Sequence, residues 1–80
     1  MTIQLISYGI ARDIVGSKEL SYTLPDHASV ADLLTKLASD YPTLAGLVSL
    51  KVAVNGSYAA AAQEISEKDE VVLIPPVSGG

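Results

Sequence analysis

Hydrophobic and polar residues alternate in two short segments near the start of the chain. Residues 2–8 set an isoleucine and a leucine between polar residues, and residues 20–24 set leucine, tyrosine and leucine between serine and threonine. This alternation is typical of strands with one buried face. Residues 11–15, between them, predict a turn or a single helical turn. Because the link is short, we expect the two strands to pair antiparallel, and Pro25 to end the second.

A helical period follows the two strands. Ser29 is placed as the N-cap of a helix, and Asp32, three residues later, completes a capping box and suits the helix dipole. Pro42 disfavours helical geometry at Tyr41, so we expect the helix to end near Asp40 or Tyr41. The apolar residues fall at i, i+3, i+4 and i+7, which predicts one stripe that covers a sheet. They are Val30, Leu33, Leu34 and Leu37.

Three more strands are predicted after the helix. Residues 44–50 carry three leucines around a glycine, which predicts an irregular segment. Residues 52–54 predict a third strand, and Asn55-Gly56 suits a hairpin turn in which both central residues have positive φ. Tyr58 begins the return strand. Residues 70–74 form a continuous apolar run, typical of a central strand.

The element order β-β-α-β-β-β predicts an α+β fold. It describes a ubiquitin-like β-grasp domain over residues 1–74, with one main helix packed on a mixed sheet and the last strand parallel to the first. Residues 75–80 are predicted to form an extended, flexible C-terminal tail. The chain of 80 residues is one small domain that buries about 60–65% of its unfolded surface. Without Phe or Trp, its core must consist of Leu, Ile, Val and Ala.

Composition excludes several classes of function. The net charge is −4 and no basic cluster is present, which argues against nucleic acid binding. The acidic charge would steer a basic protein partner at low salt, but ordinary solubility is the simpler interpretation. Without cysteine there are no disulfides, thiolate nucleophiles or cysteine metal sites. The N-terminus does not resemble a signal peptide, and no apolar run approaches the roughly 20 residues that span a bilayer. We therefore expect a cytoplasmic protein that does not contact membranes.

Candidate catalytic residues are few. His27 is the only histidine, and no second histidine or cysteine accompanies it, so we expect a solvated loop residue and no metal site. Ser29 is explained as a helix cap. The acidic residues of 64–70 lack the alternating oxygen ligands of a calcium loop. The chain is thus poorly equipped for catalysis on its own.

The last six residues suggest where the chemistry lies. Pro75-Pro76 cannot donate hydrogen bonds and favours an extended path, and Val77-Ser78 leads to the diglycine Gly79-Gly80. Fully extended, residues 75–80 would reach about 20 Å. Two residues without side chains make a thin tail that can enter a narrow site on another protein. A carboxylate becomes a good electrophile once ATP converts it to a mixed anhydride with AMP.

Three segments resemble the small subunit of molybdopterin synthase: ARDIVG at 11–16, VN at 54–55 and, above all, DEVVLIPPVSGG at 69–80. The resemblance implies a β-grasp sulfur carrier. In that family an adenylating enzyme related to ubiquitin activators joins AMP to the terminal glycine, here Gly80, and sulfur replaces the AMP to give a thiocarboxylate. The tail then inserts into the large subunit, where sulfur passes to cyclic pyranopterin monophosphate and builds the dithiolene of molybdopterin.

The resemblance also implies roles and partners. The chain would not be an enzyme on its own but the sulfur-donating subunit of a heterotetrameric complex. It would bind no cofactor, and the activating enzyme would use ATP. Its partners would be the large subunit, the ubiquitin-activator-like adenylyltransferase and a sulfur-donor protein. Tail insertion falls to Pro75, Pro76, Val77, Ser78 and Gly79.

A partner-binding face is implied at Tyr8, Tyr58 and Ile74, with Arg12 as a donor to an interface ion pair. The simpler interpretations are edge-of-core packing for the two tyrosines and a plain surface position for Arg12. Other functions stay open: a sulfur carrier for thiamine or for a thiolated tRNA base, a ubiquitin-like modifier that ends in an isopeptide bond, and an interaction module with an inert tail.

Overall fold

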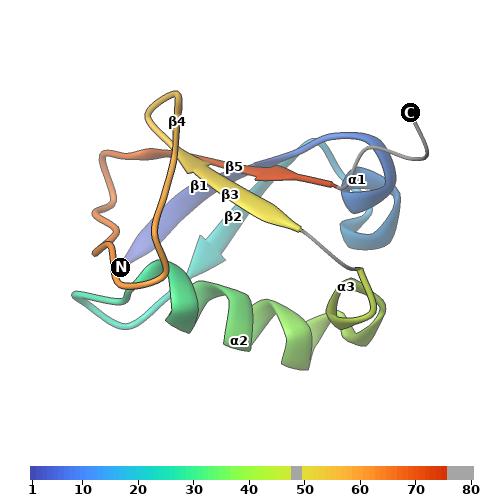
Figure 1. Ribbon diagram of the computed structural model, residues 1–80, viewed down its shortest axis with the longest axis horizontal. Helices are drawn as coiled ribbons and strands as arrows, with labels where there is room; N and C mark the ends of the chain where they lie inside the picture. Colours follow the sequence, from blue (N-terminus) through green and yellow to red (C-terminus); the bar gives the residue numbers. More distant parts are fainter. Residues whose placement is uncertain (48–49, 76–80) are drawn as a thin grey trace.

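The computed structural model describes residues 1–47 and 50–75 (Figure 1). Its elements are β1 (Thr2–Ser7), α1 (Gly9–Val15), β2 (Glu19–Thr23), α2 (Val30–Asp40), α3 (Pro42–Ala45), β3 (Lys51–Val54), β4 (Ser57–Tyr58) and β5 (Glu70–Ile74). The order of strands and the main helix agrees with the prediction. The predicted division between residues 74 and 75 stays a prediction, because residues 76–80 lie outside the described residues.

The strands form one mixed sheet in the order β2-β1-β5-β3-β4. β1 pairs antiparallel with β2, and β5 lies between β1 and β3, parallel to β1 and antiparallel to β3. The apolar run of β5 therefore occupies the central position that was predicted, with the sheet continuing on both of its edges. This topology is the β-grasp arrangement, and the fold prediction is confirmed.

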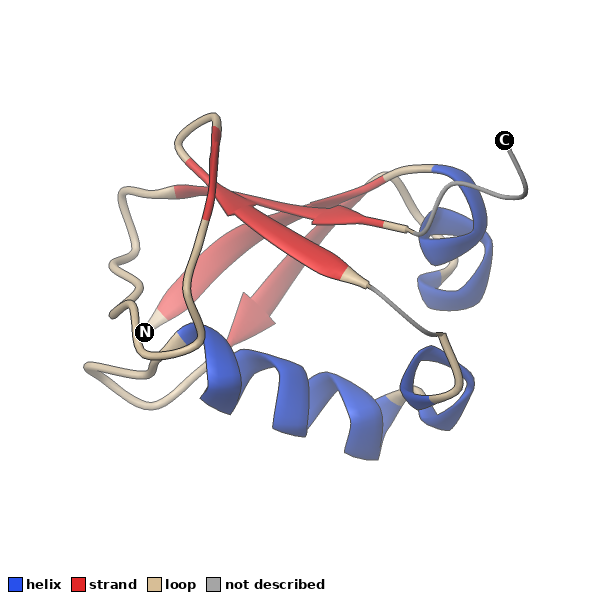
Figure 2. Ribbon diagram, in the orientation of Figure 1, coloured by secondary structure: helices blue, strands red, loops and turns tan. Residues whose placement is uncertain are grey.

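The core lies between one face of the sheet and the helices α2 and α3 (Figure 2). Strand residues at alternate positions enter it, and α2 contributes most of its apolar stripe. The predicted capping box begins α2: the Ser29 hydroxyl accepts from the Asp32 amide, and the Asp32 carboxylate accepts from the Ser29 amide. The largest fully buried side chains are Ile3, Leu5, Leu24, Leu33, Leu37, Ile65, Val71 and Leu73.

Two short helices differ from the expectations. The segment 44–50, predicted to be irregular, begins with α3, which has Pro42 at its first turn and packs Leu44 into the core at 2% exposure. Proline suits this position because its missing N–H would be unpaired there anyway. α1 is longer than one turn and starts at Gly9, with Ala11 fully buried. Both helices are held by tertiary packing, which a local period does not reveal.

Asn55 and Gly56 have φ angles of 53° and 87°, as the hairpin prediction requires. The turn joins β3 to β4, and Tyr58 pairs with Ala53 across it. Among the described residues, no helix is long and apolar enough to cross a membrane.

Candidate functional site

The second face of the sheet carries an apolar row in its middle. On this face β1, β5, β3 and β4 bring together Ile6, Val72, Ala53 and Tyr58, each paired with the next in register. In the described part of the chain, α2 and α3 lie on the other side of the sheet, so no helix covers this row (Figure 1). Tyr58 is 72% exposed, Ile6 and Val72 are half-buried, and Ala53 is buried at 7% exposure beneath them. An exposed apolar surface rimmed by polar residues marks a binding site more often than isolated surface residues do.

The row continues toward the end of β5. Ser7 pairs with Leu73 in the parallel ladder, so Tyr8 and Ile74 occupy the next position on each strand. The backbone of Tyr8 is extended, and the ring is 46% exposed. Ile74 is half-buried and pairs with Lys51. We call the set Ile6, Tyr8, Ala53, Tyr58, Val72 and Ile74 the open face.

The structure thus places Tyr8, Tyr58 and Ile74 on one side of the sheet, as the partner-face prediction requires. Sequence reasoning did not single out Ile6, Ala53 and Val72, which connect them. The signal was present in the alternation of β1 and β5, because these residues alternate with core residues. Ile10, 49% exposed at the start of α1, was also missed. Partner binding at this face stays a prediction.

Positive charges lie beside the open face near the end of β5. The Lys18 ammonium is 5.5 Å from the centre of the Tyr8 ring, and Lys51 pairs with Ile74. Arg12 is exposed on α1, the helix that follows Tyr8, and its backbone amide donates to the Tyr8 carbonyl. Two acidic residues, Asp13 and Glu19, lie in the same elements. The surroundings of Tyr8 are therefore less acidic than the net charge of the chain suggests.

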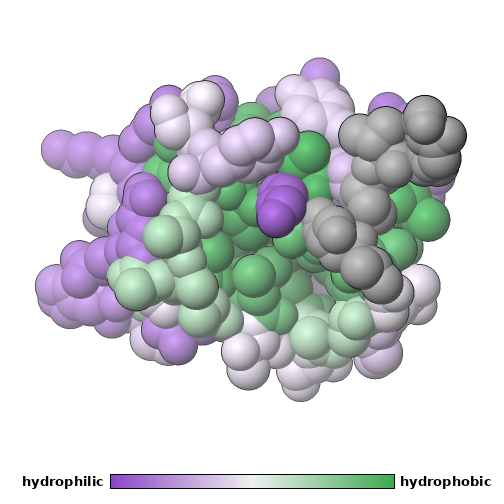
Figure 3. Space-filling model, in the orientation of Figure 1, coloured by the Kyte–Doolittle hydropathy of each residue, from purple (hydrophilic) through white to green (hydrophobic). Residues whose placement is uncertain are grey.

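Hydrophilic residues gather at the opposite end of the molecule, near the N-terminus and the turn before β5 (Figure 3). A depression of about 290 Å³ lies there, lined in part by Asp26, His27, Glu64 and Glu67. His27 Nδ1 is 3.2 Å from a Glu64 carboxylate oxygen, and both side chains are mostly exposed. Among the described residues, no group of three His, Cys, Asp or Glu could hold a metal ion. His27 is a solvated loop residue, as predicted.

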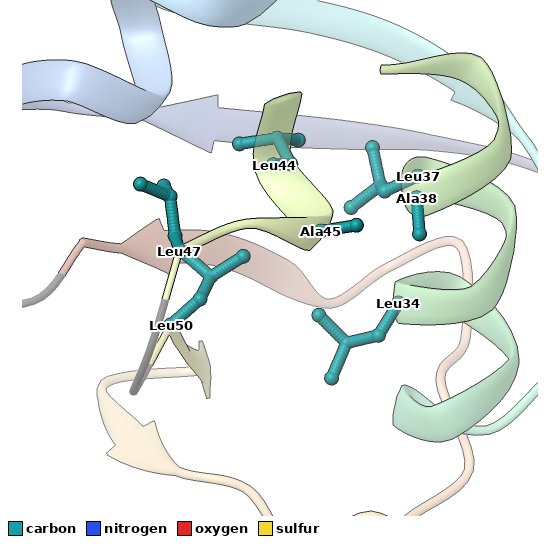
Figure 4. Close-up of a pocket in the computed structure, with 7 residues that line it drawn as sticks. All are labelled: Leu34, Leu37, Ala38, Leu44, Ala45, Leu47 and Leu50. Atoms are coloured by element: carbon teal, nitrogen blue, oxygen red, sulfur yellow. The ribbon is translucent and has the colours of Figure 1, made fainter. Parts of the chain in front are cut away.

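A second depression, of about 240 Å³, lies between α2, α3 and the start of β3 (Figure 4). Its side chains are all leucine or alanine, so it holds no group that could act as an acid, base or nucleophile. The lining residues are Leu34, Leu37, Ala38, Leu44, Ala45, Leu47 and Leu50.

Tyr22 has a strongly shifted pKa, and its role is structural. Burial, and then the 2.5 Å hydrogen bond that the Tyr22 hydroxyl donates to Asp40, raise the pKa of Tyr22 above its usual range. This bond ties β2 to the end of α2, and the Lys36 ammonium lies 4.4 Å from the centre of the same ring. The perturbation arises from packing between two elements and lies in neither depression.

The predicted reaction centre lies past the described residues. Pro75, half-buried, is the last described residue, while Pro76, Val77, Ser78, Gly79 and Gly80 lie outside. The structure describes the residue at which this segment begins. Pro75 follows directly on Ile74 and therefore begins at one end of the open face.

The chain resembles known proteins over nearly its whole length. The model of the ThiS family matches residues 6–80. The molybdopterin synthase sulfur carrier subunit of Chlamydomonas reinhardtii is 31% identical over 83 residues, with 100% of both chains covered. Small archaeal modifier protein 3 of Haloferax volcanii is 29% identical over 92 residues, again with 100% of both covered. The solution structure of the Haloferax volcanii HVO 2177 protein matches with a TM-score of 0.85 and 30% identity, covering 100% of this chain and 87% of that one.

Proposed function

Because the chain belongs to the ThiS family, we propose that it is the sulfur carrier of molybdopterin synthase and that the carboxyl group of Gly80 carries the sulfur. The resemblance drawn from the residues is confirmed by the family match and by a relative of that name at 31% identity. The observation that carries the proposal is the open face: an apolar surface that ends beside Pro75, where the segment that leads to Gly80 begins.

The chemistry needs two steps on one carboxylate. A Gly80 carboxylate oxygen attacks the α-phosphorus of ATP, and pyrophosphate leaves to give an acyl-adenylate. A hydrosulfide-level sulfur nucleophile then attacks the acyl carbon, and AMP leaves to give a thiocarboxylate. The activating enzyme binds ATP, and the nucleophile is hydrosulfide, which a thiol reductant releases from the persulfide of a sulfur-donor protein with formation of a disulfide. The thiocarboxylate then delivers its sulfur to cyclic pyranopterin monophosphate within the large subunit.

The open face is the docking surface in this proposal. Its aromatic and aliphatic side chains are of the types that dominate binding energy when a partner buries them. Arg12, Lys18 and Lys51 lie beside it and suit acidic groups on the partner, which orient the encounter more than they strengthen it. Docking at this face brings Pro75 to the partner's surface, so that residues 76–80 can enter its active site.

Intact mass spectrometry tests the proposal. The 80-residue chain is incubated with its activating enzyme, ATP and a sulfur donor, and we expect one oxygen of the protein to be replaced by sulfur. Fragmentation should place the sulfur on Gly80. An unchanged mass under these conditions, with a known carrier converted in parallel, would contradict the assignment.

A ubiquitin-like modifier is the second candidate, because a relative named small archaeal modifier protein 3 is 29% identical over its whole length. The activation step is the same in both functions. They differ in the nucleophile that attacks the activated carbonyl group of Gly80. In the modifier this is the amine of a lysine, and in the carrier it is sulfur. Conjugates joined through Gly80 to lysine in the same mass experiment would favour the modifier. Carriers for thiamine or thiolated tRNA share the thiocarboxylate and differ in the acceptor that it sulfurates.

A further inference from the structure

The first residue of α1 lies against the last described residue of the chain. Gly9 has a φ angle of 55°, and a Cβ atom built on it would lie 3.3 Å from Cγ of Pro75. Carbon atoms in van der Waals contact are about 3.5–4.0 Å apart. A side chain at position 9 would therefore displace the proline ring. Because Gly9 has no side chain, Pro75 can lie this close to it.

Gly9 differs in this from two other glycines with positive φ. Gly16 and Gly56 have φ angles of 89° and 87°, and a Cβ built on either meets no atom within 4 Å. Their backbone conformation alone explains why glycine suits them. Gly9 has the same kind of backbone constraint and, in addition, the close approach of Pro75. The close approach of Pro75 is therefore specific to Gly9 among these three glycines.

Both sides of this contact are held by neighbouring structure. On one side α1 is anchored by Ala11, which is fully buried in the core. On the other side Ile74 is paired with Lys51 in the sheet, and the ring of Pro75 fixes its own φ angle. A Cβ atom at position 9 therefore acts on the ring of Pro75, at the point where the chain leaves β5.

We propose that Gly9 is a positioning residue for the reaction at Gly80, because its contact with Pro75 sets the direction in which the chain leaves β5. The inference rests on the proposed function. Five residues follow Pro75, so the direction of the chain at Pro75 sets where those residues start toward a partner's active site. Reacting atoms must come within about 3–3.5 Å, and a misplacement of about 1 Å can reduce the rate about 100-fold.

Gly9→Ala and Gly16→Ala form a matched pair for the test. Each puts an alanine at a position with positive φ, but only Gly9→Ala adds an atom against Pro75. The measurement is the kcat and KM for pyrophosphate release by the activating enzyme, well below the Tm of each variant. We expect both variants to lose Tm, and Gly9→Ala to lose more, because its Cβ also meets Pro75. Gly9→Ala should lower kcat about tenfold with KM within about twofold, since the open face still docks, and Gly16→Ala should keep both within about twofold.

Pro75→Ala removes the ring atom that a Cβ at position 9 would meet, and it supplies the rescue. In the double variant, Gly9→Ala should lower kcat by less than about threefold relative to Pro75→Ala alone. This comparison also decides the case in which Gly9→Ala alone does not fold. The nuclear Overhauser effect between Gly9 Hα and Pro75 Hγ checks the contact independently of activity.

The outcomes separate this inference from the proposed function. Equal kcat for Gly9→Ala and Gly16→Ala, or a loss as large without the Pro75 ring as with it, overturns the positioning role and leaves the carrier function standing. Failure of the unaltered chain to release pyrophosphate overturns both.

Discussion

At the scale of single residues, Asn55 does more than form a turn. Its side-chain oxygen accepts from the Glu70 amide and its side-chain amide donates to Asp69, each at 2.9 Å, while its backbone amide donates to the Glu70 carbonyl. The Asn55-Gly56 dipeptide predicted the positive φ angles. It could not predict these bonds, because their partners lie some 15 residues further along the chain. They fasten the β3–β4 hairpin to the start of β5.

The carboxylate of Asp69 makes this junction sensitive to pH. Hydrogen bonds from the Ser66 amide and from Asn55 hold the pKa of Asp69 below its usual range. A lowered pKa means that the ionised form stabilises the fold, so the contribution is fully present above the unfolded value of about 3.9 and is lost as pH falls through the folded pKa. We expect Asp69→Asn to lower Tm by a few degrees at pH 7, and the difference from the unaltered chain to shrink below about pH 4.

Glu67→Gln is the control for this pH series of thermal melts. It removes a carboxylate from the same turn that accepts none of these hydrogen bonds among the described residues. Its Tm should follow that of the unaltered chain at every pH. A Tm difference for Asp69→Asn that persists unchanged to pH 3 would show that the charge of Asp69 does not stabilise the junction.

At the scale of elements, local patterns predicted whatever has a local cause. β1 and β2 follow from a period of two residues and α2 from a period of 3.6, and the capping box fixed the start of α2. α3 escaped prediction because four residues cannot form a stable helix alone, and it exists through the burial of Leu44 and the position of Pro42. The beginning of α1 was missed for the same reason, since Ala11 is buried by distant residues.

The open face also depends on the arrangement of whole strands, because β5 lies at its centre and contributes Val72 and Ile74. Changing Ile74 to Asp puts a charge where a partner would bury an aliphatic side chain. We expect binding to the large subunit to weaken by about 2 kcal/mol, roughly 30-fold, measured by titration calorimetry. Tyr58→Ala should also weaken binding while leaving Tm nearly unchanged, because its ring is 72% exposed.

Ser21→Asp is the matched control for Ile74→Asp. Ser21 is exposed on the same side of the sheet, on the edge strand β2 and opposite Gln4, away from the apolar row. It should change the affinity little. Unaltered affinity in folded Ile74→Asp and Tyr58→Ala variants would remove the open face as the docking surface.

At the scale of the whole molecule, the site could be predicted only in pieces. Tyr8, Tyr58 and Ile74 were chosen from the resemblance, but the row that joins them depends on which strands are neighbours. Ile6 and Val72 meet because β5 lies beside β1, and Gly9 meets Pro75 because α1 follows β1 at that same end of the sheet. Such contacts between distant parts of the chain have no local signal.

The proposed function places the chemistry outside the residues that stabilise the fold. In the described residues the core closes at Leu73, before the segment that is proposed to react. Residues outside a packed core contribute little to stability. Removing residues beyond the core should therefore change the reaction and leave the fold intact.

Deletion of Gly80 tests the central claim most directly, because it moves the carboxyl group without touching the core. Two quantities are measured on the deletion variant beside the full chain: Tm, and molybdopterin formed with the activating enzyme, ATP, a sulfur donor, the purified large subunit and cyclic pyranopterin monophosphate. We expect an unchanged Tm and no product, since the carboxyl group would end at Gly79, one residue short of the reacting position. Full product formation by the variant would show that Gly80 is not the reaction centre.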